Sequence, residues 1–185
     1  GENIVFIPET RAPYYRTKKY HHAYWSSELL AEIIGDNIIR LQGNMEEVPP
    51  VGSIYTDKGP HGKNRVFPGI ILHASSGISL EVINIYMSGA MALIAENTEN
   101  VTLREFNVRL RPGSNRIISA SADATHFVNC RGLIHFENCL FENMLDDATN
   151  VHGTYMKVAD LSGDRLAVQF GHYQQEGFQF ARKGD

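Results

Sequence analysis

The chain has 185 residues, of which 43% are hydrophobic and 21% are charged, and its formal net charge is −4. This composition is that of an ordinary globular chain with a core. It excludes a disordered chain, and it excludes insertion into a membrane because no apolar stretch approaches the roughly 20 residues of a spanning helix. The acidic balance, without clusters of Lys and Arg among aromatic residues, argues against nucleic acid as a partner.

Residues 1–66 are predicted to form a small β-barrel-like piece. Within it, Trp25–Ile34 has a helical pattern, with a serine able to cap the first turn and a glycine after the end. A hairpin competes with this helix, because Leu30–Ile38 echoes Val158–Leu166 in placing a Gly-Asp turn between apolar segments. The echo also predicts that residues 157–185 begin a second β-barrel-like piece.

A repeat fills the middle of the chain. Ile78–Ile85, Val101–Val108 and Ile134–Phe141 share the pattern apolar-x-apolar-x-x-apolar-x-apolar, with Cys139 taking one apolar position. A further apolar residue stands seven positions before each block: Ile71, Ile94 and Phe127. Alternation predicts strands, and a period in the twenties is typical of one turn of a parallel β-helix. The wider spacing before the third block predicts an excursion at Arg109–Arg116.

The predicted fold class is therefore all-β, with a right-handed parallel β-helix over residues 67–156 and small β-barrel pieces inserted beside it. A β-helix of about three turns exposes its core at both ends unless more chain covers it. We expect the sequence to be a fragment of a larger chain.

The chain has two cysteines, Cys130 and Cys139. Their spacing matches neither a pair of zinc ligands nor the framework of a small disulfide-linked domain, so they do not fix the redox compartment. Cys139 is expected to be a packed thiol because it occupies an apolar position of the repeat.

Acidic residues form a second level of repetition. Asp123-Ala124-Thr125 returns as Asp147-Ala148-Thr149, and Asp146 directly precedes the second copy. On neighbouring strands about 4.8 Å apart, Asp123 and Asp147 would stack, and their negative charges would repel each other. Such an arrangement is usually found where the acids share a proton or bind a metal or a substrate. Strand alternation directs Asp146 to the other side. A solvated turn is the ordinary alternative.

This trio suits inverting hydrolysis of a glycoside. In that reaction one protonated carboxylic acid donates its proton to the leaving oxygen, and an ionised carboxylate holds the attacking water. The two groups lie roughly 6.5 to 9.5 Å apart. We predict Asp123, Asp146 and Asp147 as the catalytic residues.

The same alignment selects candidates for substrate binding. His126 and Asn150 share a register with Leu93 and are predicted hydrogen-bond donors beside the acids, whereas Ala90 aligns with Asp123 and Asp147 and leaves space. The remaining candidates for contact with substrate are Glu96, Arg116 and His152.

At these residues the chain strongly resembles the α-1,3-galactosidase family that removes the terminal galactose of the blood group B antigen, known as glycoside hydrolase family 110. The resemblance is most specific over Ser121–Phe127 and Asn138–Gly153. Asn64–Gly69 and Ser88–Met91 look similar as well.

The resemblance implies a parallel β-helix interrupted by β-barrels, and hydrolysis by inversion without a metal or other cofactor. It makes Asp146 the general acid, while Asp123 and Asp147 would orient the attacking water.

The partners that the resemblance implies are a glycan substrate and the remaining parts of a several times longer chain. An exported location, periplasmic, at the cell surface or secreted, is expected, with a signal that this fragment does not contain.

Two alternatives stay open. In a calcium-dependent polysaccharide lyase the three acids would bind the ion and an arginine such as Arg116 would abstract a proton, so a chelator would abolish activity. A non-catalytic carbohydrate-binding segment is the other. A zinc site is disfavoured because His126 and His152 lack the two-histidine spacing on one element.

Overall fold

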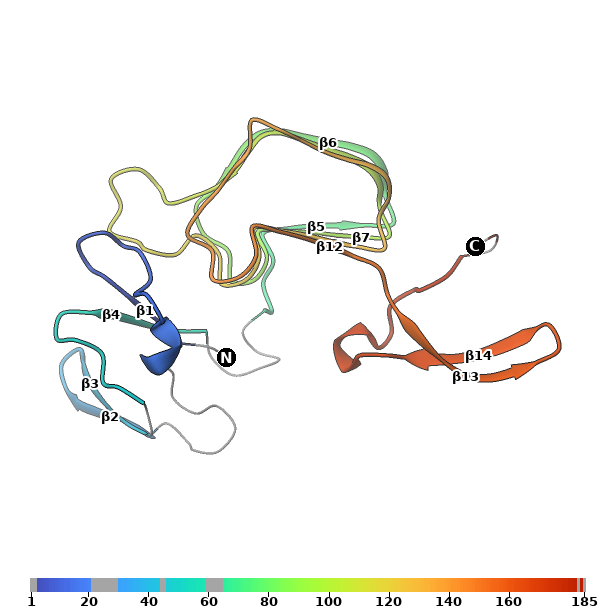
Figure 1. Ribbon diagram of the computed structural model, residues 1–185. Helices are drawn as coiled ribbons and strands as arrows, with labels where there is room; N and C mark the ends of the chain where they lie inside the picture. Colours follow the sequence, from blue (N-terminus) through green and yellow to red (C-terminus); the bar gives the residue numbers. More distant parts are fainter. Residues whose placement is uncertain (1–2, 21–29, 44–45, 59–64, 183, 185) are drawn as a thin grey trace. The chain divides into compact units, whose positions relative to one another are not determined.

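Figure 1 shows the computed structural model, which describes residues 3–20, 30–43, 46–58, 65–182 and 184. The chain divides into two compact units, Gly1–Asn64 and Arg65–Asp185. The described residues form β-strands and short 3-10 helices but no α-helix, which confirms the all-β class. In this described part, no helix has the length and apolar character needed to cross a membrane.

In the first unit the described residues form two antiparallel strand pairs. β1 (Asn3–Phe6) pairs with β4 (Ile54–Asp57), and β2 (Leu30–Gly35) pairs with β3 (Ile38–Gln42). The 3-10 helix η1 (Thr17–Tyr20) is tied to β1, because the buried Asn3 side chain donates from Nδ2 to the carbonyl of Tyr20 at 2.8 Å.

The helix predicted for Trp25–Ile34 is wrong where the structure describes it, because Leu30–Ile34 lie in β2. Trp25 and its neighbours lie outside the described residues. The competing hairpin is confirmed, with Asn37 in the left-handed region at a φ of 57° in the turn between β2 and β3. Asparagine tolerates this conformation, which a continuing helix would not contain.

The echoing segment in the second unit is also a hairpin. β13 (Met156–Ser162) and β14 (Arg165–Phe170) pair antiparallel around Gly163, whose φ is 61°. The 3-10 helix η2 (Tyr173–Gln175) follows.

Two parallel sheets make up the rest of the second unit. The first contains β5 (Ile70–His73), β7 (Leu93–Glu96), β9 (Thr125–Val128) and β12 (Thr149–His152), in that order. In the second, β8 (Glu99–Val108) lies between β6 (Ser76–Ile85) on one side and β10 (Arg131–Glu137) with β11 (Leu140–Phe141) on the other. The chain alternates between the sheets, and successive turns, called rungs here, superpose closely (Figure 1).

The repeated apolar positions form the core of these rungs. Val101, Leu103, Phe106 and Val108 of β8 are fully buried with their neighbours from β7 and β9. Cys139 packs against this core as predicted, with its thiol donating to the carbonyl of Leu103 at 3.5 Å. Burial raises the pKa of the Cys130 thiol, and both free cysteines pack against the core.

The registers of the two sheets differ by one residue. Ile134 pairs with Val101 as predicted, but Phe127 pairs with Ala95 rather than with Ile94. The extra residue lies between Arg131 and Ile134, a segment that contains Gly132, because the register between β10 and β8 shifts there. The predicted excursion at Arg109–Arg116 is present as an irregular loop between β8 and β9, yellow-green in Figure 1.

Gly132 is the residue on which this shift depends. Its φ is 66°, and an added Cβ would lie 2.3 Å from Oδ1 of Asn100, the atom that accepts the N–H of Leu133 at 3.0 Å. Gly77, in the first rung, has a nearly identical φ of 67° but nothing within 4 Å of an added Cβ. At both positions a residue with a Cβ would strain the backbone, but only at Gly132 would it also meet a neighbouring side chain.

We predict that Gly132→Ala lowers the free energy of unfolding by about 1–3 kcal/mol more than Gly77→Ala does. Both substitutions strain the backbone, but only the first also disrupts a hydrogen bond at the corner. Urea unfolding of the two variants measures the difference. Equal losses would contradict a steric role for Asn100.

Candidate active site

The acidic repeat lies at equivalent points of two successive rungs, just before β9 and β12. The N–H of Ala124 donates to the carbonyl of Asp147 at 2.9 Å, and Thr125 pairs with Thr149 along the ladder. The hydroxyl oxygens of these two threonines also lie 2.9 Å apart. The predicted alignment of the two copies is therefore confirmed, and it brings Asp123 and Asp147 together.

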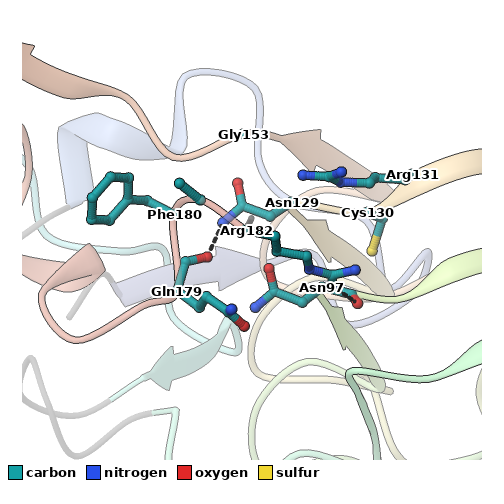
Figure 2. A pocket seen from close by; sticks show the side chains of 9 residues that line it. Asn97, Asn129, Cys130, Arg131, Gly153, Gln179, Phe180 and Arg182 are labelled. Carbon is teal, nitrogen blue, oxygen red and sulfur yellow. Dashed lines mark hydrogen bonds between the residues drawn. The ribbon is translucent and has the colours of Figure 1, made fainter. Parts of the chain in front are cut away.

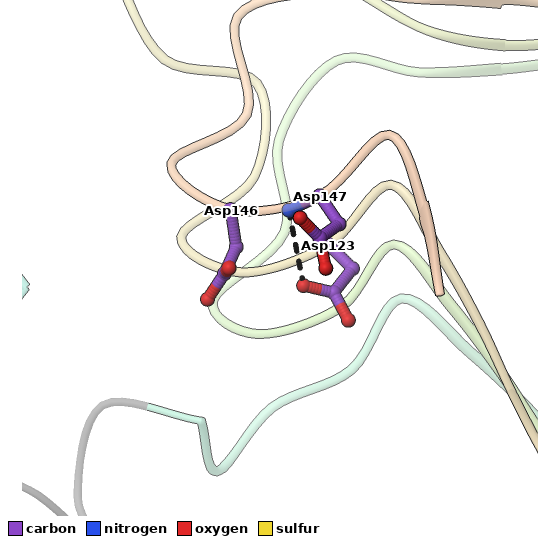
Figure 3. A group of neighbouring side chains, drawn as sticks. All are labelled: Asp123, Asp146 and Asp147. Carbon is purple, nitrogen blue, oxygen red and sulfur yellow. Dashed lines mark hydrogen bonds between the residues drawn. The ribbon is translucent and has the colours of Figure 1, made fainter. Parts of the chain in front are cut away.

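Asp123 is a buried carboxylate, with a relative exposure of 1%. Its Oδ1 accepts the backbone N–H of Asp147 at 3.3 Å, and its Oδ2 is in hydrogen-bond contact with Nδ1 of His126 (Figure 3 shows the first of these contacts). Both oxygens are thus held, and the orientation of this carboxylate is fixed by the rung that follows it and by its own strand.

Asp146 has a different environment. Its side chain leaves the turn in a direction different from that of Asp147 (Figure 3), and its Oδ2 accepts a hydrogen bond from Nη2 of Arg65. The two side chains are 31% and 37% exposed respectively, so this ion pair is open to solvent. Arg65 is a site residue that sequence reasoning missed; its only signal was its position in the Asn64–Gly69 segment.

The three acids form one group. Asp123, Asp146 and Asp147 each offer an oxygen within 4.8 Å of the others, and such a set could hold a cation. This closest approach is shorter than the roughly 6.5 to 9.5 Å between carboxyl groups in inverting glycosidases. This limit joins single oxygens, one from each side chain, whereas the separation in inverting glycosidases is measured between whole carboxyl groups.

The two predicted histidines lie beside the buried acid. His126, 8% exposed, contacts Asp123 through Nδ1, and its Nε2 lies 2.9 Å from Nε2 of the half-buried His152. The rings meet edge to face, with centroids 4.9 Å apart. Nδ1 of His152 lies 2.9 Å from the carbonyl oxygen of Gly153.

The predicted alignment of Leu93, His126 and Asn150 on neighbouring strands is partly wrong. His126 does pair with Asn150, but Ile94 rather than Leu93 lies next to them, because of the one-residue difference between the sheets. Likewise the N–H of Ala92 donates to the carbonyl of Asp123 at 3.0 Å, so Ala90 is not the residue level with Asp123.

The remaining candidates occupy separate places. Nδ2 of Asn150 donates to Oδ2 of Asp147 at 3.4 Å, so this amide joins the acidic group. Glu96 ends β7 and lies 3.4 Å from Nδ1 of His73 on the neighbouring strand. Arg116 is exposed in the excursion loop, with Nη1 near the sulfur of Met87.

A cavity of about 240 Å³ lies at the corners that follow β7 and β9, and its lining contains none of the predicted site residues (Figure 2). Arg182 donates from Nη2 to the carbonyl of Asn97, and Asn129 donates from Nδ2 to the carbonyl of Gln179 at 3.2 Å. These bonds attach the C-terminal segment to the corners. The cavity therefore lies between this segment and the corners, away from the acids.

Comparison with known proteins finds relatives over most of this chain. Alpha-1,3-galactosidase A of Shewanella woodyi is 35% identical over 152 residues, 82% of this chain and 24% of that protein. Alpha-1,3-galactosidase B of Parabacteroides distasonis is 42% identical over 123 residues, 65% of this chain and 20% of that protein. The chain is similar to one segment of alpha-1,3-galactosidases.

A third relative, alpha-1,3-galactosidase B of Akkermansia muciniphila, is 32% identical over 157 residues, which are 83% of this chain and 19% of that protein. The chain thus spans a quarter or less of the length of these relatives. No family model matches it.

We predict that Asp123→Ala lowers the free energy of unfolding by about 2–4 kcal/mol, because His126 and the N–H of Asp147 lose a buried partner. Asp147→Ala should change it by less than about 0.5 kcal/mol, since this side chain is exposed and its loss also relieves like-charge repulsion. Urea unfolding of both variants tests the contrast. Equal changes would show that Asp123 is not anchored as described.

Proposed function

We propose that the chain belongs to the α-1,3-galactosidase family and carries the catalytic acids of a glycoside hydrolase. The observation that carries the proposal is the gathering of Asp123, Asp146 and Asp147, with oxygens within 4.8 Å, at one edge of the stacked rungs. Relatives named alpha-1,3-galactosidase A and B support it. The substrate would be a terminal α-1,3-linked galactose, including that of blood group B type glycans.

For the whole protein we propose a right-handed parallel β-helix with inserted β-barrel pieces, assigned to glycoside hydrolase family 110 and exported from the cytoplasm. The two parallel sheets of superposed rungs support the β-helix. The greater length of the relatives supports further parts that complete the substrate-binding surface.

The proposed reaction assigns each acid a step. Asp146 gives its proton to the glycosidic oxygen as the bond from the anomeric carbon to that oxygen breaks. A water held by Asp123 and Asp147 supplies its oxygen to the anomeric carbon and its proton to this pair. Solvent then removes the proton from the pair and returns one to Asp146, so the net reaction consumes one water.

This role for Asp146 sets a condition on Arg65. A general acid must carry a proton, whereas a guanidinium that donates to a carboxylate stabilises the anion. The solvent-exposed pair must therefore separate when substrate binds, so that Asp146 can carry its proton.

Inversion of the anomeric centre is the proposed stereochemistry. Asp123 is poorly suited to attack a sugar, because it is buried and both of its oxygens are held. Retention is the rival outcome, favoured by the short closest approach of the acids, since retaining enzymes place their carboxyl groups only about 5–5.5 Å apart.

We expect Asp146→Asn to lower kcat for galactose release from a B-type trisaccharide by about 10²–10⁴-fold, the usual contribution of a positioned proton donor. Asp164→Asn, in the hairpin turn of β13 and β14, is the matched control and should retain full activity. Release should persist in EDTA, which separates a metal-free hydrolase from the calcium-dependent lyase. A folded full-length protein that releases no galactose would refute the proposed function.

The anomer of the first product decides the stereochemistry. Proton NMR recorded during the first minutes of hydrolysis should show β-galactose before mutarotation, because single displacement inverts an α-linkage. Initial α-galactose would mean that one of the exposed acids acts as a nucleophile.

A further inference from the structure

The buried acid of the site poses an electrostatic problem. Asp123 has almost no contact with solvent and lies with two other carboxylates whose oxygens are within 4.8 Å. Burial and neighbouring like charges both favour the protonated form of a carboxyl group. A carboxylate that must receive a proton from water therefore needs a source of positive charge close to it.

A continuous chain of contacts leads away from Asp123. Its Oδ2 contacts Nδ1 of His126, the Nε2 atoms of His126 and His152 lie 2.9 Å apart, and Nδ1 of His152 lies 2.9 Å from the carbonyl oxygen of Gly153. The chain has three links, and each joins two atoms at hydrogen-bond distance. It ends at a carbonyl oxygen, which can only accept a hydrogen bond, so Nδ1 of His152 must donate one.

Counting protons along this chain gives a definite result. Each of the three links needs one hydrogen. A neutral imidazole carries a single N–H, so two neutral histidines supply only two hydrogens. The third must be an additional proton, held as a carboxylic acid on Asp123 or as an imidazolium on His126 or His152.

The surrounding charges favour the imidazoles over the carboxyl group. Asp147 adds a negative charge next to Asp123, whereas Asp146 is paired with Arg65, and an imidazolium at His126 touches Asp123 directly. Attraction between opposite charges is strong at a site so poorly exposed to water. With the proton on either ring, Asp123 stays ionised and all three hydrogen bonds are made.

We propose that His126 and His152 together hold one extra proton and act as a single cationic pair that keeps Asp123 ionised. Resting on the proposed function, this makes both histidines positioning residues for the base rather than contacts for the sugar. His126 supplies the hydrogen bond and charge next to Asp123, and His152 fixes the ring of His126 and shares its proton.

The protonation state can be observed without substrate. We would label the histidines of the full-length protein with ¹⁵N, record long-range proton–nitrogen spectra at neutral pH, and assign the two rings with His126→Gln and His152→Gln. The expected result is three protonated nitrogens among the four of the pair. Two neutral rings would overturn the proposal, whether or not the protein hydrolyses galactosides.

Kinetics provide the second test. His126→Gln can still donate an amide hydrogen to Asp123 but carries no charge, so kcat should fall roughly 100-fold, the size of effect seen when one preorganised polar group is lost. KM should change much less, because the sugar is not contacted. His135→Gln, on β10 in the other sheet, is the control and should behave as the wild type.

A His126→Gln variant with kcat within twofold of the wild type would also overturn the proposal. So would a large rise in KM with kcat unchanged, since that result would make His126 a substrate contact. Absence of galactosidase activity in the wild type would refute the proposed function alone, because the spectra report the charge of the pair independently.

Discussion

The parallel pairing of β9 with β12 is the constraint on which the candidate site depends. It fixes Thr125 beside Thr149 and directs the N–H of Ala124 to the carbonyl of Asp147, so two acids distant in sequence are brought into contact. The N–H and C=O groups of these strands form their hydrogen bonds whichever side chains precede the strands. The rungs can therefore hold repelling carboxylates together, because the repulsion is opposed by a whole strand pair rather than by one contact.

The three acids differ in the hydrogen-bond and ion-pair partners that offset this repulsion. Asp123, the buried member, receives the N–H of Asp147 and a contact with His126, whereas Asp146 faces Arg65 at the surface. Asp147 is exposed and receives the amide of Asn150. The same three side chains thus have three different environments, which is the condition for carboxyl groups of identical chemistry to take different roles.

Sequence periodicity predicted what the backbone ladder determines, including the all-β class, the alignment of Asp123 with Asp147, and the hairpins around Asn37 and Gly163. It failed where one residue breaks the period: Gly132 adds a residue to one sheet only, so Leu93 was aligned with His126 in place of Ile94. It also failed at Arg65, because an ion pair across 81 positions leaves no local pattern. The contact between His126 and His152 was missed for a similar reason: they pair diagonally across two strands, whereas the alignment compared only residues in one row.

The unequal anchoring also determines which part of the site can move. Asp123 cannot turn without breaking contacts to the next rung and to His126, both in a region shielded from water. The ion pair between Asp146 and Arg65 is exposed to solvent, and exposed pairs of this kind contribute little to stability. An adjustment that opens the group to a sugar and a water is therefore easier at the exposed pair of Asp146 and Arg65 than at the buried Asp123. The fixed acid then defines the position of the water, and the movable acid adapts to the leaving oxygen.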